Sequence, residues 1–243
     1  MKIIFSPSKG MNKKKINLQL DEKKILFPEK TEKIIKKLQT FSKEEIGNLM
    51  KIKGVLLNNT YENILNYSML ESTISIGLYD GVSFSNLELE KYREKEFKYL
   101  EKYCRIFSAL YGVVTPSTLI KPYRLDMTVK IFEESLYSYW KNSIEKEFYK
   151  DEIIINLASG EFSKLLNRKE YKFIDIEFRQ IQGENIKNIS NEAKKMRGKF
   201  LDFLIKNNID DLNIEKIKLF SQEGYKLNIK LCEDDKYFFT KNI

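Results

Sequence analysis

Short apolar runs and amphipathic segments alternate along the whole chain. Apolar runs bounded by turn residues are typical of buried strands, and they predict strands near 2–5, 105–108, 128–132, 152–157, 172–178, 225–230 and 236–240. Apolar positions at helical spacing predict helices near 30–40, 42–51, 59–67, 86–103, 136–148, 160–167, 190–206 and 213–218. Strands and helices interleave without a strict βαβ rhythm. The pattern therefore predicts an α+β fold in which several helices flank a mixed β-sheet.

Length and composition favour a single domain. The 243 residues include only 4 prolines and 10 glycines, with no linker, low-complexity stretch or internal repeat. A mixed fold of this length commonly forms one domain, and we expect one that spans 1–243. The apolar runs fall far short of the approximately 18 residues that cross a bilayer, and the first residues lack the apolar core of a signal peptide. We expect a cytoplasmic protein with no membrane partner, and we predict no protein partner.

Histidine is absent from the chain, and the two cysteines, Cys104 and Cys232, lie far apart in sequence. Zinc-site spacing and any histidine-dependent catalytic triad are therefore excluded. Reduced, buried thiols are favoured over a disulfide, and we predict no metal and no cofactor. If the protein is an enzyme, its acid or base is a carboxylate, a lysine or a tyrosine.

The net charge favours an anionic partner. Lysine and arginine number 43 against 35 acidic residues, which gives a formal charge of +8. Such a balance fits a nucleic acid as partner. A chain rich in Lys, Ile and Asn also gains lysines from composition alone, so the position of each charge matters more than the total.

The segment 104–131 concentrates polar chemistry after a buried run. An apolar stretch ends at a glycine, and two prolines stiffen the chain beyond it. Lys121-Pro-Tyr-Arg-Leu-Asp126 then places a lysine, a phenol, a guanidinium and a carboxylate within six residues. This density indicates a site that uses Tyr123, Arg124 and Asp126. The alternative is that Arg124 pairs with Asp126 and that Tyr123 covers a hydrophobic cluster with its hydroxyl in water.

Two predicted strands end in polar residues. The strand near 2–5 runs into Ser6-Pro-Ser-Lys-Gly10, which offers hydroxyl and ammonium groups, above all those of Ser6 and Lys9, to an anion without P-loop spacing. A later strand reaches Asn156 and leads through Ser159 into a helix. Ser159 suits either contact with an anionic ligand or a simple N-cap.

The predicted helix over 190–206 separates its basic side chains by face. Helical spacing leaves Lys194 and Arg197 on one flank, where they suit a phosphate clamp, and Lys195 and Lys199 on another. The core side comprises Ala193, Met196, Phe200, Phe203 and Leu204. Gly198 costs about 1 kcal/mol relative to alanine inside a helix, so we expect a neighbour to pack close to the backbone there. The alternative is an ordinary solvated basic face.

Short motifs spread in order over almost the whole length carry a family resemblance. They are SPSK at Ser6–Lys9, LMKI at Leu49–Ile52, RIFSALYGVVTP at Arg105–Pro116, PYRLDM at Pro122–Met127, LYSYW at Leu136–Trp140, NLAS with a following glutamate at Asn156–Glu161, AKKMRG at Ala193–Gly198 and EGY at Glu223–Tyr225. Through them the chain resembles the YaaA family of bacterial peroxide stress-resistance proteins. Asp126 stands where the family has a glutamate, which keeps the carboxylate and shortens its reach.

The resemblance implies an α+β fold and protection against hydrogen peroxide, by limiting the free iron that turns peroxide into hydroxyl radical and by binding DNA. In this interpretation a positively charged cleft binds DNA through side chains that pair with phosphates or stack on a base. These are Ser6, Lys9, Tyr111, Tyr123, Arg124, Asn156, Ser159, Lys194 and Arg197, with Phe162 as a further stacking face. The segment Leu49–Val55 is also compatible with the hairpin of a helix-hairpin-helix, a DNA-backbone clamp that the resemblance implies. Iron binding has little support from the residues, because histidine and an obvious carboxylate cluster are absent.

Two functions therefore remain open. The first is a DNA-binding stress protein without catalysis, whose affinity falls steeply with salt and depends on Lys194 and Arg197. The second is an enzyme that acts on a nucleotide or a damaged base in the same cleft, with Asp126 or Glu161 as acid or base. Lys9 and Tyr123 are the other candidates for an acid or base.

Overall fold

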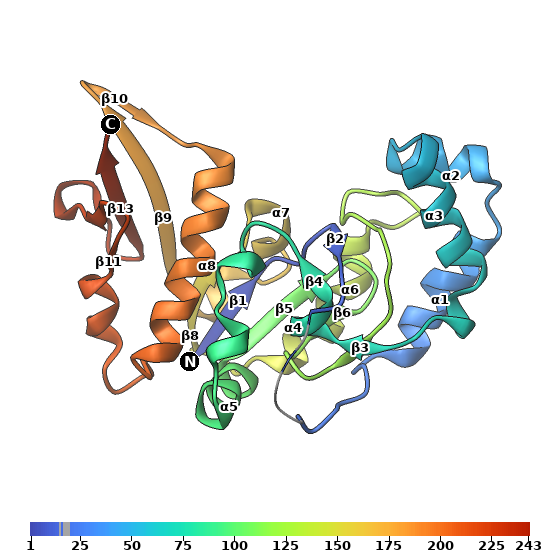
Figure 1. The fold of residues 1–243 in the computed structure, drawn as a ribbon, viewed down its shortest axis with the longest axis horizontal. Helices are drawn as coiled ribbons and strands as arrows, with labels where there is room; N and C mark the ends of the chain where they lie inside the picture. The colour runs from blue at the N-terminus through green and yellow to red at the C-terminus, as the bar shows by residue number, and fades with distance from the viewer. Residues whose placement is uncertain (15, 17–19) are drawn as a thin grey trace.

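A twisted β-sheet forms the centre of the computed structural model, which describes residues 1–14, 16 and 20–243 (Figure 1). Its strands follow the order β11-β12-β13-β9-β8-β1-β5-β6, and β10 pairs with β9 beside this path. The bounds are β1 Lys2–Phe5, β5 Cys104–Ser108, β6 Gly112–Val114, β8 Ile153–Leu157, β9 Lys172–Gln182, β10 Asn185–Lys187, β11 Ser221–Gln222, β12 Tyr225–Leu227 and β13 Lys236–Asn242. Two small ladders join β2 Gly10–Met11 to β4 Tyr79–Asp80, and β3 Thr73–Ile74 to β7 Leu119–Ile120.

The middle of the sheet is parallel and its margins are antiparallel. Strands β5, β1, β8, β9 and β13 run in the same direction, whereas β6, β10, β11 and β12 pair antiparallel with their neighbours. Phe5 at the end of β1 lies opposite Ile106 on one side and Leu157 on the other. The sheet is therefore mixed and the fold is α+β in a single domain, which confirms the predicted fold class.

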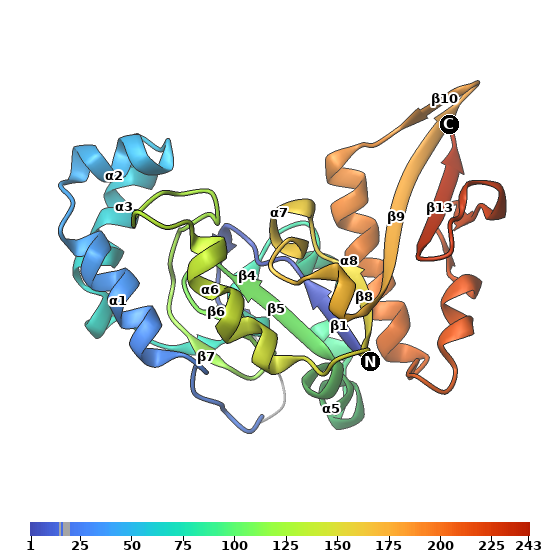
Figure 2. The ribbon, with the colours of Figure 1, turned by 180° about the vertical axis from the view of Figure 1, so that it is seen from behind.

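Helices cover both faces of the sheet and one end of the molecule. Figure 1 shows the face that α5 and α8 cover, and Figure 2 shows α6 and α7 on the opposite face. Helices α1, α2 and α3 lie together at one end, far from β9 and β13. The bounds are α1 Pro28–Gln39, α2 Lys43–Met50, α3 Gly54–Leu65, α4 Ser75–Leu78, α5 Glu94–Tyr103, α6 Leu136–Ile144, α7 Gly160–Ser163 and α8 Ser190–Lys206. Short 3₁₀ helices span Tyr67–Met69, Phe84–Asn86, Leu89–Lys91, Glu145–Glu147, Arg168–Glu170, Ile214–Leu219 and Ile229–Leu231.

Burial explains why the central elements match their predictions. Ile3, Ile4 and Phe5 are at most 1% exposed, as a parallel strand covered on both faces requires. The predicted core stripe of α8 is buried except for the partly buried Phe203. Phe200 of this helix packs against Phe178 of β9, with ring centroids 6.1 Å apart. One hydrophobic core thus joins β1, β9 and α8.

Helix α2 begins with the capping box that the sequence contains. Ser42 Oγ accepts a hydrogen bond from the Glu45 amide at 3.3 Å, and Glu45 Oε2 accepts one from the Ser42 amide at 2.7 Å. The helix ends at Met50, and residues 51–53 connect it to α3. The segment Leu49–Val55 therefore contains a tight junction between two helices.

One predicted strand is wrong, and one predicted helix starts too early. Residues 128–132 form no strand, although Met127, Val129 and Ile131 are buried in alternation, because the chain turns where the Val129 amide donates to the Asp126 carbonyl. The helix expected over 86–103 begins only at Glu94, after two 3₁₀ turns, because Arg93 is extended and its amide donates to Glu96.

Other differences between the predicted and observed elements concern short elements and the ends of longer ones. The sequence did not predict the short helix α4 or the strands β2, β3, β4, β6, β7, β10 and β11. The helix expected over 160–167 ends at Ser163, and the strand expected over 225–230 ends at Leu227. The expected helices 59–67 and 136–148 are α3 and α6, with shifted ends, and the expected helix 213–218 is a 3₁₀ helix. Both cysteines are free thiols, as predicted; Cys104 is buried and Cys232 is half-buried. Among the described helices, none has the length and apolar character needed to cross a membrane.

Candidate functional site

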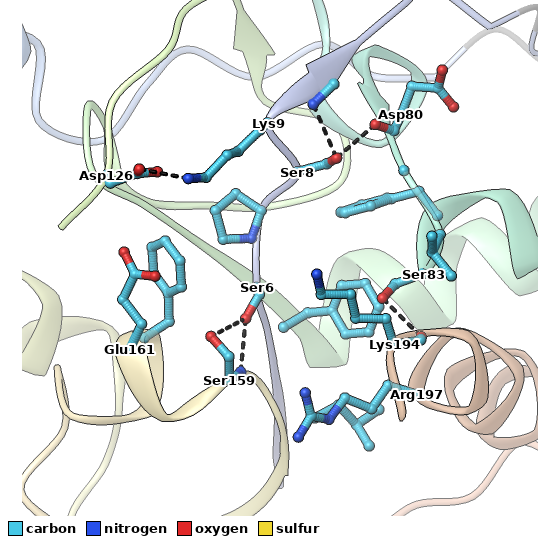
Figure 3. Close-up of a pocket in the computed structure, with 18 of the residues that line it drawn as sticks. Ser6, Ser8, Lys9, Asp80, Ser83, Asp126, Ser159, Glu161, Lys194 and Arg197 are labelled. Carbon is cyan, nitrogen blue, oxygen red and sulfur yellow. Dashed lines mark hydrogen bonds and ion pairs between the residues drawn. The ribbon is translucent and has the colours of Figure 1, made fainter. Parts of the chain in front are cut away.

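A pocket of about 390 Å³ opens where β1 and β8 end (Figure 3). The carboxyl ends of neighbouring parallel strands meet at one edge of a sheet, and ligands commonly bind there when the strand order reverses. Strand β1 stands at such a reversal, with β5 on one side and β8 on the other. The lining comes from the segments 5–10, 80–84, 123–126 and 157–162 and from α8. Of the predicted site residues, the pocket brings together Ser6, Lys9, Tyr123, Arg124, Asp126, Ser159, Glu161, Phe162, Lys194 and Arg197.

Ser6 and Ser159 form the hydroxyl floor of the pocket. Ser6 Oγ accepts a hydrogen bond from the Ser159 amide at 2.8 Å and lies 3.2 Å from Ser159 Oγ. Ser159 stands in the N-cap position of α7 with an extended backbone, but its side chain makes no capping hydrogen bond. The hydroxyl predicted to cap the helix therefore ties the end of β1 to the start of α7.

Lys194 and Arg197 form the cationic wall, on the flank of α8 that faces the pocket. Burial lowers the pKa of the Arg197 guanidinium, and its Nε atom is buried without a hydrogen-bond partner among the described residues. Lys195 and Lys199 lie on the other flank and both pair with Glu223. The predicted separation of the basic side chains by face is confirmed.

Gly198 brings α8 against the segment 80–84. A Cβ atom at this position would lie only 2.1 Å from the Ser83 carbonyl oxygen, so the close approach predicted at this glycine is confirmed. The Ser83 hydroxyl also donates to the Lys194 carbonyl at 2.8 Å. These contacts hold the cationic wall at the pocket.

Asp126 and Glu161 form the carboxylate wall on the opposite side (Figure 3). Asp126 Oδ2 pairs with Lys9 Nζ at 2.6 Å, and Glu161 Oε1 accepts a hydrogen bond from the Met127 amide at 3.1 Å. The alternative pairing of Arg124 with Asp126 is wrong, because Lys9 reaches Asp126 instead. Within residues 1–14, 16 and 20–243, none of Arg124, Lys194 and Arg197 makes an ion pair.

Tyr123 turns its hydroxyl into the protein. The hydroxyl lies 2.7 Å from Ser108 Oγ and 3.0 Å from the Tyr79 hydroxyl. Burial raises the pKa of the Tyr123 phenol to about 12. The expectation of a hydroxyl in water is therefore wrong, and the phenol stays protonated at neutral pH.

We expect Tyr123→Phe to lower the free energy of unfolding by about 1–2 kcal/mol, because two buried hydroxyls lose a partner. Since an exposed tyrosine has a pKa of roughly 10, the Tyr123 phenol stabilises the fold below about pH 10. That contribution is lost as pH rises toward about 12. Urea unfolding followed by circular dichroism at pH 7 and over pH 9–12 measures both effects. A variant as stable as wild type at pH 7 would contradict the assignment.

Two predicted site residues do not line the pocket. Tyr111 is 1% exposed, and its ring edge packs on Tyr123 with centroids 5.3 Å apart, so no base can stack on it. Its hydroxyl bonds to Tyr67 and to the backbone of Lys121. Asn156 donates to Asp175 at 2.7 Å and accepts from the Ala158 amide, so its side chain holds the end of β8.

The segment 80–84 lines the pocket but was not predicted. The Asp80 carbonyl accepts a hydrogen bond from Ser8 Oγ at 2.6 Å, and hydrogen bonds from Asn12 and then Lys14 lower the pKa of the Asp80 carboxyl. In the sequence, Gly81 is the residue that hints at this close packing. The structure explains the glycine, because a Cβ there would lie 2.3 Å from Ser8 Oγ. Within the described residues, His, Cys, Asp and Glu side chains form no group of three or more that could hold a metal ion.

Comparison with known proteins places the chain in a family. Residues 1–231 match the sequence model of a family described as peroxide stress protein YaaA. A UPF0246 protein of Fusobacterium nucleatum is 44% identical over 247 residues, which cover 99% of each chain. UPF0246 proteins of Clostridioides difficile and Malacoplasma penetrans are 34% and 32% identical, over 99% of this chain and 100% and 99% of theirs. The chain therefore belongs to the YaaA family of peroxide stress proteins.

Proposed function

We propose that the protein acts in the response to peroxide stress by binding DNA, with phosphate groups received by the cationic wall and Arg124. The family description supports the stress role. The net charge of +8 supports an anionic partner.

The observation that carries this proposal is that Arg197 lines the pocket without an ion pair to a described residue. Its guanidinium lines the pocket, yet its buried Nε atom finds no partner in the described part of the chain. A buried polar group without a partner costs free energy. The guanidinium makes no hydrogen bond or ion pair with a described residue, so its terminal N–H groups can donate to oxygen acceptors of a ligand in the pocket. Phosphate oxygens match a guanidinium in charge and geometry.

Fluorescence anisotropy with labelled duplex, single-stranded and bubble DNA, titrated across a salt series, tests the proposal. We expect log K to fall linearly with log[salt], with a slope of about −0.9 for each duplex phosphate neutralised. Weak binding without salt dependence would show that the positive charge is mainly compositional.

A second candidate is an enzyme that acts on a nucleotide or a damaged base in the same pocket. The carboxylate wall favours it, because binding a phosphate backbone requires no acidic side chain. Asp126 or Glu161 would serve as acid or base and Arg124 would hold a phosphate.

Asp126→Asn separates the two candidates. The substitution removes one negative charge and weakens the contact with Lys9, so a binding protein should bind DNA equally well or more tightly. An enzyme that uses Asp126 as its acid or base should lose turnover. Anisotropy gives the affinity, and mass spectrometry of nucleotides and lesion-bearing oligonucleotides incubated with each protein gives the turnover. Tighter binding with no product from either protein supports the binder, whereas a product formed by wild type alone supports the enzyme.

A further inference from the structure

The two sides of the pocket carry side chains of opposite charge. Figure 3 shows the carboxylate wall of Asp126 and Glu161 on one side, the cationic wall of Lys194 and Arg197 on the other, and the hydroxyl floor between them. A phosphate alone would satisfy only the cationic wall. A ligand that spans the pocket must therefore be anionic at one end and carry hydrogen-bond donors at the other.

Each acidic side chain retains an oxygen that can accept. Glu161 Oε1 takes the Met127 amide and Asp126 Oδ2 takes Lys9. Within the described part of the chain, neither Glu161 Oε2 nor Asp126 Oδ1 accepts a hydrogen bond. An ionised carboxylate only accepts hydrogen bonds, so these oxygens select N–H or O–H groups of a ligand.

The volume of the pocket limits the size of the ligand that it can hold. A volume of about 390 Å³ lies within the range of small-molecule sites, roughly 300–1,000 Å³, and suits one nucleotide. A duplex can only lie across the mouth of such a pocket. An enzyme or binding protein that reads one base in a pocket receives it unpaired, and reads the hydrogen-bonding edge that pairing normally hides.

We propose that the pocket binds a single unpaired nucleotide, with its phosphate on the cationic wall and its base on Glu161, and that it prefers guanine. This inference rests on the proposed function, because it assigns the ligand of the same site. Guanine presents two adjacent N–H donors on its pairing edge, which match the two oxygens of a carboxylate. Glu161 Oε2 is open, and Oε1 keeps a second lone pair beside the one that accepts from the Met127 amide. Thymine presents one N–H between two carbonyl oxygens, and a carboxylate repels those oxygens.

Isothermal titration calorimetry with dGMP, dTMP and inorganic phosphate tests this assignment. We expect wild type to bind dGMP at least about tenfold more tightly than dTMP, as two hydrogen bonds to a charged group allow. Glu161→Gln should remove most of this difference, because an amide offers one acceptor and one donor. It should not weaken phosphate binding, because it removes one negative charge from the pocket. Glu184→Gln is the matched control, since Glu184 is exposed in the β9–β10 turn and should keep the preference.

Other outcomes separate this inference from the proposed function. Equal affinity for dGMP and dTMP would overturn the guanine assignment. If no mononucleotide binds while DNA binding still requires Lys194 and Arg197, the inference fails and the proposed function stands. If DNA binding is also independent of Lys194 and Arg197, both fail.

Discussion

Lys194→Ala/Arg197→Ala should flatten the slope of log K against log[salt] for single-stranded DNA by about 1.4, which corresponds to two lost phosphate contacts. At 0.1 M salt the same loss should weaken binding by roughly 25-fold. Both side chains line the pocket and neither makes an ion pair with a described residue, so their charge is available to a ligand. Fluorescence anisotropy across the salt series measures slope and affinity together.

Lys195→Ala/Lys199→Ala provides the matched control. It removes two positive charges from the same helix, but from the flank where both lysines pair with Glu223. We expect the slope of this variant to equal that of wild type. Equal flattening by the two double variants would mean that DNA responds to total charge and that the pocket has no special role.

Gly198→Ala should lower the free energy of unfolding by about 1–3 kcal/mol or more, the range for overpacking a tight contact. The new Cβ would lie 2.1 Å from the Ser83 carbonyl oxygen and 2.9 Å from the carbonyl carbon, and backbone atoms cannot rotate away. Helix propensity alone predicts the opposite sign, a gain of about 1 kcal/mol. Urea unfolding followed by circular dichroism therefore gives a result whose sign decides between packing and propensity.

Gly160→Ala is the control for this substitution. A Cβ at Gly160 meets no atom within 4 Å and its backbone shows no positive φ, so its stability should stay near wild type. If Gly198→Ala were as stable as Gly160→Ala, the contact between α8 and Ser83 would not be what positions the cationic wall.

The sequence predicts the elements whose side-chain pattern has a single explanation. Strand β1 contains an apolar run of three residues, Ile3 to Phe5, and α8 has a complete helical stripe, so both match the structure. The strand predicted over 128–132 is wrong, because buried side chains alternate there as in a strand although the backbone turns at Asp126. Periodicity reports which side chains are buried, and it does not report whether a neighbouring strand is available for pairing.

For the candidate site, too, the sequence indicates which residues matter but not how they are arranged. Motifs indicate which residues carry polar chemistry, and most of them do meet in one pocket. The direction in which each of these side chains points depends on packing against residues that are distant in sequence. Tyr111 points into the core, and Asp126 pairs with Lys9, which lies 117 residues away in the chain, rather than with nearby Arg124. The segment 80–84 has almost no polar motif, and it reaches the pocket because Gly81 and Gly198 permit close backbone contacts.

A crystal structure of the protein with a short single-stranded oligonucleotide tests the central claim most directly. We predict one nucleotide inside the pocket, with a phosphate oxygen within hydrogen-bond distance of Arg197 and with the base toward Glu161. An empty pocket, with the strand bound only at the junction 51–53 between α2 and α3 or on another surface, would contradict the account.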